Sequence, residues 1–513
     1  MEQSFQPRGK LLARNTLLNV AGYGAPLLVG VVAMPYVIRG LGAASFGILS
    51  IAWVLLAYLS FFDLGFGKAA TKYVAECLGR GDNGQIARWV WTSVGLELVF
   101  GVAGAAVFGA VTPLLAERVL KIPPNLIRDA KVSFFLLAAS LPVVLVTNGL
   151  RGVLEAAQRF DLINYVRVPV NTSVFLLPAI GVAFGLHLPG IVLLLVLTRV
   201  GGALAYLMLA VAVFPALRRS FSFSPKLVRP LASFGGWITV SNVVSPLLTY
   251  VDRFFIGALL SMAAVAYYAA PYEAVTRAGL ILPASLATTL FPAFSSLDAV
   301  GARERVAGFY VRSLKLLLLA LGPVLLLVVV FAHTILHLWL GAGFAQKSTL
   351  TLQILAVGVL INALAGIPFI LLPSFGRPDL PAKFLLLELP IYASLLWFLI
   401  GRMGIAGVAL AWTLRVGLDA VLLFGACAWL RIVPLRALGE RHLLRSILAV
   451  SGLALALLVA LLTRAALAIQ VGLAAAAILL FGVVAWSLAM DDADKTLLAA
   501  AASHFAVAFG RSK

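Results

Sequence analysis

Long apolar runs, repeated from one end of the chain to the other, are the feature that most constrains its fold. We identify about fourteen such runs, each of about 17–30 residues, joined by short polar connections. A helix of about 20 apolar residues crosses the hydrocarbon core of a bilayer and satisfies its own backbone hydrogen bonds. Strands of a transmembrane barrel would be shorter and would alternate apolar with polar residues. The sequence therefore predicts an all-α, polytopic membrane protein.

Composition supports this class, because 62% of the residues are hydrophobic and only 12% are charged. Soluble proteins are about 45–50% apolar and about 25% charged. No connection exceeds about 25 residues, so we expect no soluble domain. The expected spans are 15–37, 44–66, 89–112, 132–150, 168–186, 188–214, 233–259, 263–291, 313–336, 349–372, 384–400, 404–430, 444–462 and 471–490.

The net charge of +19 does not indicate a nucleic-acid partner, because no segment is long enough to form a solvated basic domain. In a membrane protein, Lys and Arg instead set the orientation of the spans. With the N-terminus inside, 27 of them fall on the inner side, 8 on the outer side and 4 within spans. We therefore expect both termini in the cytoplasm. The connection 113–131 is an exception, since it carries four basic residues on the outer side.

A weak internal repeat predicts how the spans are grouped. Residues 25–28 (APLL) resemble residues 245–248 (SPLL), 220 positions later. Six spans separate the two, so both halves have the same orientation, as in transporters with parallel repeats. We expect an N-lobe (1–214), a C-lobe (215–430) and a C-terminal part (431–513) with two extra spans and a cytoplasmic tail. Chance matching of apolar sequence is the alternative explanation of the repeat.

Four arginines lie within spans: Arg199, Arg253, Arg277 and Arg415. Each would cost about 2.5–3.5 kcal/mol at the centre of a bilayer, so we expect them to face an interior that is wet or filled by anions. Arg199 has no acidic neighbour in its own span, which favours a role with a ligand.

The other three arginines have acidic neighbours. Glu273 precedes Arg277 by one helical turn, and Asp419 follows Arg415 by one turn, so each pair shares a helix face. Ion pairs that hold helices together are the alternative explanation for both. Asp252 and Arg253 are adjacent and point about 100° apart, so they cannot serve one face equally.

The sequence carries no sign of metal or enzyme chemistry. Its two cysteines are far apart, and no Gly-rich phosphate loop or nucleophile–base arrangement is present. His333 and His337 share one helix face. A position at the membrane interface explains them more simply than a metal site does. We therefore predict no cofactor, no metal and no enzymatic activity.

Three segments, in this order and spacing, carry a family resemblance: 63–67 (DLGFG) with Lys72 and Tyr73, 151–160 (RGVLEAAQRF), and 252–257 (DRFFIG) followed by 265–268 (VAYY). Together the segments resemble polysaccharide-biosynthesis flippases of the O-antigen translocase type. These belong to the multidrug/oligosaccharidyl-lipid/polysaccharide (MOP) exporter superfamily. The resemblance covers nearly the whole chain in length, span number and loop size.

The resemblance implies two six-helix lobes around a central cavity in the bacterial inner membrane. It also implies a substrate of undecaprenyl-pyrophosphate-linked oligosaccharide, moved from the inner to the outer leaflet by alternating access. A polymerase and a chain-length regulator are the candidate partners. Arginine suits a pyrophosphate or an acidic sugar. The expected substrate-binding residues are therefore Arg199, Arg277, Arg253 and Arg415, with Arg277 favoured over Arg253 by its mid-span position.

The acidic residues Asp252, Glu273 and Glu388 are candidates for binding a coupling proton or Na⁺, or for gating. Asp63, at the end of the second span, is a further candidate, although capping the next helix is the simpler role. A peptidoglycan-precursor (lipid II) flippase remains an alternative that the sequence separates poorly. A multidrug antiporter of the same superfamily fits the four arginines less well. A membrane glycosyltransferase or O-antigen ligase would be expected to have a long outer loop.

Overall fold

A computed structural model of the chain describes residues 26, 28–59, 65–219, 221–299, 303–434, 436, 439–463, 466–492 and 494–496. Within these ranges the regular elements are helices, and no strand occurs. In the same part of the chain, nine helices are long and apolar enough to cross a membrane. The all-α membrane fold is thereby confirmed, and the number of fourteen spans stays a prediction.

An apolar helix at Leu28–Leu41 comes before the labelled elements. The longer helices that follow it are α2 (Ala43–Leu59), α3 (Phe66–Arg80), α4 (Asn83–Leu114), α5 (Ile127–Ala156), α6 (Phe160–Ala183), α7 (Leu188–Val213), α9 (Pro225–Leu259), α10 (Met262–Ala299), α11 (Arg303–Val330), α13 (Ala342–Ser374), α14 (Asp379–Trp429), α15 (Arg441–Leu462) and α16 (Leu467–Val484). The short helical pieces are η1 (Leu115–Val119), η2 (Pro124–Leu126), α8 (Ala216–Arg219), α12 (Ala332–Leu340) and η4 (Ala485–Ala489).

The chain divides into two compact units. The first unit comprises Met1–Arg277 and Leu385–Val408, and the second comprises Ala278–Phe384 and Ala409–Lys513. The predicted lobes, 1–214 and 215–430, and the C-terminal part, 431–513, stay predictions.

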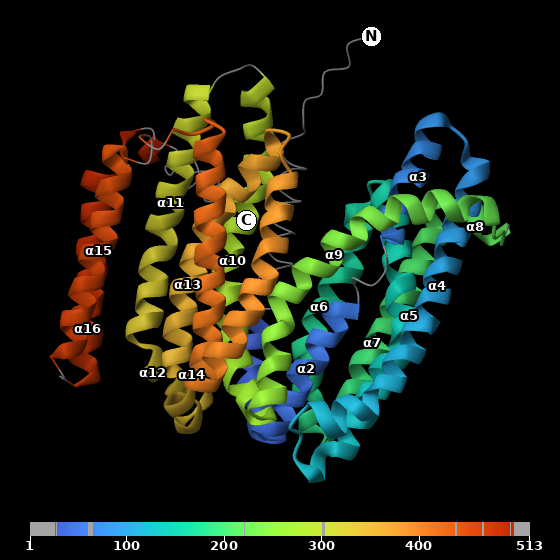
Figure 1. The fold of residues 1–513 in the computed structure, drawn as a ribbon, viewed down its shortest axis with the longest axis horizontal. Coiled ribbons are helices and arrows are strands. Elements are labelled where there is room, and N and C mark those ends of the chain that lie inside the picture. Colours follow the sequence, from blue (N-terminus) through green and yellow to red (C-terminus); the bar gives the residue numbers. More distant parts are fainter. Residues whose placement is uncertain are drawn as a thin grey trace, which may run out of the picture. The chain divides into compact units, whose positions relative to one another are not determined.

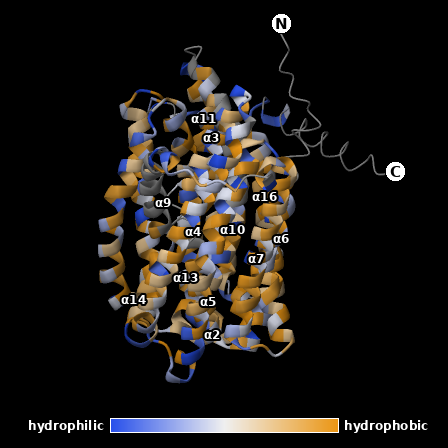
Figure 2. Cartoon of the chain, turned by 90° about the vertical axis from the view of Figure 1, so that its right-hand side faces the viewer, coloured by the Kyte–Doolittle hydropathy of each residue, from blue (hydrophilic) through white to orange (hydrophobic). Residues whose placement is uncertain are grey.

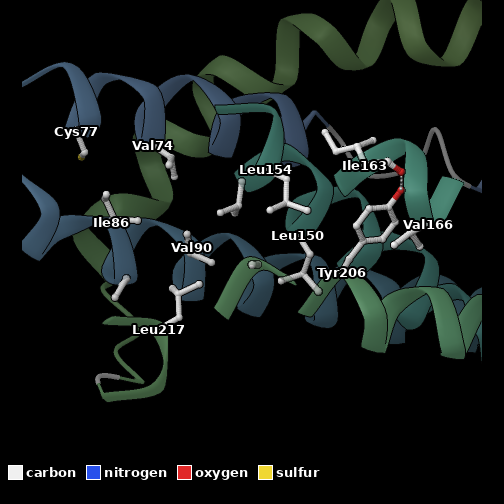
Figure 3. Packing of buried hydrophobic residues seen from close by; sticks show 13 residues of the cluster. Val74, Cys77, Ile86, Val90, Leu150, Leu154, Ile163, Val166, Tyr206 and Leu217 are labelled. Atoms are coloured by element: carbon white, nitrogen blue, oxygen red, sulfur yellow. Dashed lines mark hydrogen bonds between the residues drawn. The ribbon is translucent and has the colours of Figure 1, made fainter. Parts of the chain in front are cut away.

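In the first unit, α5 packs between α4 and α7, and α6 packs against α7 (Figure 1). Gly101 allows α4 to approach α5 closely, because a Cβ there would lie 2.5 Å from the Cα of Pro142. Figure 3 shows the apolar cluster at one end of this bundle, where Leu150 and Leu154 of α5 face Val90 of α4. This packing holds in place the helices that carry the polar side chains of the unit.

Helix α3 is a short amphipathic helix that the span prediction did not identify. It begins after Gly65 and ends at Gly81, whose φ angles of 74° and 71° favour glycine. The helix buries small and apolar residues, among them Ala70 and Val74, against α4 and α5. Its polar face carries Lys72, which lies 3.8 Å from Glu76.

In the second unit, α11 packs against α13 and α15, and α15 packs against α16. The predicted span 313–336 is interrupted, since α11 ends at Val330 and α12 begins at Ala332 after the non-helical residue Phe331. The predicted spans 384–400 and 404–430 lie within α14, where Gly404 breaks the helical geometry with φ 57° and ψ −134°. Only glycine adopts such angles readily, so the boundary expected near residue 402 has a backbone cause.

The helices carry an apolar outer surface, as a lipid-facing protein requires. Large apolar side chains such as Val32 (79% exposed) and Leu338 (73% exposed) are open to the surroundings. In Figure 2, hydrophobic residues dominate the middle of helices such as α5, α7 and α13, whereas hydrophilic residues gather nearer the helix ends. This distribution is that of a multi-pass membrane protein.

Candidate functional site

A polar cavity of about 260 Å³ lies within the first unit. It is built by side chains of α2, α6, α7, α9 and α10. Three of the four arginines expected at the site, Arg199, Arg253 and Arg277, line this cavity together with Glu273. The remaining lining residues are Pro26, Ser50, Trp53, Val54, Leu56, Asn171, Val174, Phe175, Tyr250 and Ala269.

Arg253 is held by two carboxylates. Its Nη2 donates to Glu273 Oε1 at 2.7 Å, and its Nη1 lies 3.6 Å from Asp252 Oδ1. Its side chain is only 1% exposed, and its guanidinium lies 4.6 Å from the centre of the Tyr272 ring. Removing one member of such a buried pair costs about 3–5 kcal/mol, because a charge remains without a partner. Through its bond to Glu273, Arg253 links α9 to α10, and its role in substrate binding stays a prediction.

Asp252 makes further contacts besides the one with the Arg253 guanidinium. Its carboxylate accepts a hydrogen bond of 2.7 Å from the Tyr268 hydroxyl on α10 and one of 2.7 Å from the backbone N–H of Arg253. The Asp252 side chain is fully buried. Asp252 therefore contacts α10 through Tyr268. Arg253 contacts the same helix through Glu273.

Arg277 shares the carboxylate of Glu273 but stays accessible. Its Nε donates to Glu273 Oε2 at 2.7 Å, which confirms that these two residues share a helix face. The Arg277 side chain remains 46% exposed, and its guanidinium lies 5.0 Å from the centre of the Phe175 ring. The Nη groups of Arg277 are thus available to a ligand in the cavity while its Nε stays bonded to Glu273.

Arg199 differs from both, because it makes no hydrogen bond and no ion pair with any residue that the structure describes. Asn171 of α6, which lines the same cavity, is also without a hydrogen bond in the described ranges. The indole N–H of Trp53 is buried and has no acceptor there either. All three groups can donate hydrogen bonds. Trp53 is the buried donor among them, and a buried donor without an acceptor is costly, whereas Arg199 is partly exposed and Asn171 is exposed. The cavity therefore suits a ligand rich in oxygen acceptors.

The other predicted site residues are placed as follows. Glu388 is fully buried on the part of α14 that belongs to the first unit, and it is not among the described residues lining the cavity. Arg415 lies on the part of α14 that belongs to the second unit. Asp63 lies outside the described residues. The roles assigned to these three residues stay predictions.

Sequence analysis did not identify the neutral residues of the site. Asn171 and Tyr250 line the cavity, and Tyr268 and Tyr272 support its charges. Asn171 had a usable signal, since an amide within an apolar span needs a hydrogen-bond partner. The tyrosines had none, because tyrosine is common in apolar cores.

Metal binding finds no support in the described part of the chain, where no group of three or more His, Cys, Asp and Glu residues could hold an ion. The rings of His333 and His337 are stacked with their centres 6.1 Å apart.

Comparison with known proteins gives a family and a fold. Residues 12–298 match the model of a family described as "Polysaccharide biosynthesis protein". A Shigella flexneri protein named "Putative O-antigen transporter" is 30% identical over 413 residues, which cover 80% of this chain and 96% of that protein.

Solved structures extend the comparison. An inward-facing multidrug resistance MATE family transporter of the MOP superfamily superposes with a TM-score of 0.69 at 14% identity, covering 80% of this chain and 94% of the other. A MOP superfamily transporter from Pyrococcus furiosus gives a TM-score of 0.58 at 16% identity, covering 83% and 96%. At these identities the structures support the fold and not a shared substrate.

Proposed function

Because the chain belongs to the polysaccharide biosynthesis protein family of the MOP superfamily, we propose that it is a flippase for a lipid-linked oligosaccharide. This membership confirms the resemblance found in the sequence. The proposed substrate is undecaprenyl-pyrophosphate-linked oligosaccharide, which the protein moves from the inner to the outer leaflet by alternating access. The named activity of the Shigella flexneri relative supports a transporter rather than an enzyme.

The observation that carries the proposal is the set of unsatisfied donors in the cavity of the first unit. Arg199 and Asn171 have no partner among the described residues, and Arg277 is half exposed beside them. A pyrophosphate supplies anionic oxygens to guanidinium forks, and a glycan supplies further acceptors. In this proposal Arg199 and Arg277 bind the head group, whereas Arg253 positions Glu273. Arg415 is proposed as a further contact from the C-lobe.

Glu273 is the proposed gating residue, because it holds arginines of two different helices with its two carboxylate oxygens. Loss of the contact with Arg253 would change how α9 and α10 are tied together, whereas loss of the contact with Arg277 would free one carboxylate oxygen within α10. Asp252, Glu388 and Asp63 stay as the other candidates for gating or for binding a coupling proton or Na⁺. The proposed location is the bacterial inner membrane with both termini in the cytoplasm. A polymerase and a chain-length regulator are the proposed partners.

A multidrug antiporter is disfavoured because Glu273, the carboxylate of the cavity that could bind a cationic drug, is already paired with arginines. The carboxylate of Glu273 already accepts hydrogen bonds from Arg253 and Arg277. A lipophilic cation would have to displace an arginine to reach it. A lipid II flippase differs from our proposal only in the glycan, and an experiment on cells separates the two.

The test uses a strain that lacks the gene. We expect the strain to lose one surface glycan and to accumulate the lipid-linked repeat unit inside, while peptidoglycan synthesis continues. The wild-type gene restores export, and Arg199→Gln or Arg277→Gln reduces it at normal protein level. Arg159→Gln is the control, since Arg159 is exposed and paired with Asp161 at 2.9 Å. Unchanged surface glycan with altered drug tolerance would contradict the proposal, and arrested peptidoglycan synthesis would favour lipid II.

A further inference from the structure

A second, smaller cavity lies in the first unit between α5, α6 and α7. Its volume is about 120 Å³. It shares two lining residues, Arg199 and Asn171, with the larger cavity. Neither side chain makes a hydrogen bond or ion pair with a described residue. The other lining residues are Val144, Thr147, Asn148, Arg151, Arg167, Val170, Gly202 and Tyr206.

Positive charge dominates this second cavity. Three arginines line it, and no carboxylate is among the described lining residues. Arg151 lies 3.2 Å from Glu155, but that carboxylate also lies 3.9 Å from Lys68. Glu155, which is not among the described lining residues, therefore contacts both Lys68 and the lining residue Arg151. Arg167 donates to Asn164 Oδ1 at 2.6 Å. With three arginines and no carboxylate among its described lining residues, the cavity favours an anion.

The walls of the second cavity are held in place by packing. The Tyr206 hydroxyl of α7 donates to the backbone carbonyl of Ile163 at 3.2 Å, and Figure 3 shows this bond beside Val166 and Leu150. Gly202 lets α7 approach α6, because a Cβ there would lie 3.2 Å from Val170 Cγ2. A binding site works best when such supporting contacts fix its side chains before the ligand arrives.

We propose that this cavity is a second anion subsite, which binds the phosphate-bearing part of a prenyl-linked substrate. Arg151 and Arg167 hold the anion there, and Arg199 with Asn171 serves both cavities. The inference rests on the proposed function, because it assumes an anionic lipid-linked substrate. Arg151 and Arg167 belong to a segment that the charge distribution predicts on the cytoplasmic side. In this proposal the anion binds this subsite first. It then moves to the larger cavity, where it contacts Arg277, and Arg199 contacts the anion in both positions.

The test measures binding to the purified full-length protein in lipid nanodiscs, with farnesyl diphosphate as the probe. We expect Arg151→Gln combined with Arg167→Gln to raise the Kd at least tenfold, because hydrogen bonds to charged groups are lost. The matched control is Arg159→Gln, which removes an arginine outside both cavities and leaves the Kd within twofold. Replacing both arginines by lysine keeps the charge and is expected to recover part of the affinity. If the double Gln variant does not fold, Arg167→Gln alone is expected to raise the Kd at least threefold.

A folded double Gln variant with the wild-type Kd would overturn the second subsite. The same measurement is repeated with inorganic pyrophosphate as the probe, and we expect it to bind at least tenfold more weakly than farnesyl diphosphate. Equal binding of both would overturn the assignment to a lipid-linked anion. Suppose that Arg199→Gln loses export while the double Gln variant binds and exports normally. That outcome contradicts the second subsite and leaves the proposed function standing. Normal export in both Arg199→Gln and Arg277→Gln removes the proposed function itself.

Discussion

Each unit contains a cluster of buried and partly exposed charges, and the two clusters differ in balance. In the second unit, Arg312 and Lys315 of α11 meet Asp491 and Asp494, which follow η4. Arg312 Nε donates to Asp494 Oδ1 at 2.6 Å, and Lys315 contacts both carboxylates. We call these four residues the C-terminal clasp. Its two cations face two carboxylates, and all four side chains have partners.

In the first unit the balance is different, because the cavity carries one cation more than its carboxylates can pair. Asp252 and Glu273 engage Arg253 and Arg277, and Arg199 is left without a partner in the described ranges. The free-energy cost of burying charges is lowest when each charge has a partner of opposite sign, and it is high for a buried charge without one. The clasp thus has the character of a structural device. We propose that the cavity is a site completed by an anion.

The largest expected effect is the loss of a clasp residue. Lys315→Met leaves Asp491 and Asp494 with only Arg312, and we expect it to lower the free energy of unfolding by about 3–5 kcal/mol. Combining it with Asp494→Asn restores the charge balance and is expected to recover part of this loss. Thermal unfolding in detergent measures both. An unchanged melting temperature in Lys315→Met would show that the clasp contributes nothing to stability.

The second prediction compares two arginines of the same cavity. Arg253→Met leaves Asp252 and Glu273 buried with fewer partners, and we expect a loss of about 3 kcal/mol in stability. Arg277→Met removes a half-exposed pair and should cost less than about 1 kcal/mol. Thermal unfolding and surface-glycan export are measured for both variants. If the two variants are equally unstable, the division between a structural and a ligand-binding arginine is wrong.

The third prediction concerns the unpaired charge. Arg199→Gln removes a cation that has no described partner, so we expect an equal or higher melting temperature. Affinity for farnesyl diphosphate should fall about 10- to 100-fold, the equivalent of about 1.5–3 kcal/mol for hydrogen bonds to a charged group. Binding in nanodiscs gives the second quantity. A clear loss of stability in this variant would indicate a protein partner and would place Arg199 with the balanced clusters.

Much of this comparison was predictable from the sequence, and the reason lies in periodicity. Span length predicts helices, and the spacing of Glu273 and Arg277 by four residues predicts their shared face. The lack of an acid near Arg199 within its span agrees with the absence of an ion pair to any described residue, and its role in ligand binding stays a prediction. Contacts between helices are not encoded in spacing. The bond from Arg253 to Glu273 crosses a hairpin, and Lys315 meets Asp491 across 176 residues. Such pairs become visible only when packing places the helices.

The smallest expected effect is the response of the clasp to acid. Burial raises the pKa of the Asp491 carboxyl. The hydrogen bond from the Asp494 backbone N–H and the charges of Lys315 and Arg312 outweigh burial, so that its pKa lies below the ordinary value. A carboxyl with a lowered pKa stabilises the fold fully above its unfolded pKa, about 3.8. This contribution is lost as the pH falls through the folded pKa.

We therefore expect the melting temperature to stay level from pH 7 to about pH 5 and to fall below about pH 4, where Asp491 begins to titrate in the unfolded chain. Asp491→Asn should be less stable at pH 7 and should show a shallower fall in acid. The exposed part of the side chain keeps the effect small, since solvent screens its charges. Asp161→Asn, which removes an exposed carboxylate outside the clasp, is the control. Parallel acid profiles for wild type and Asp491→Asn would mean that the clasp is held by Asp494 alone.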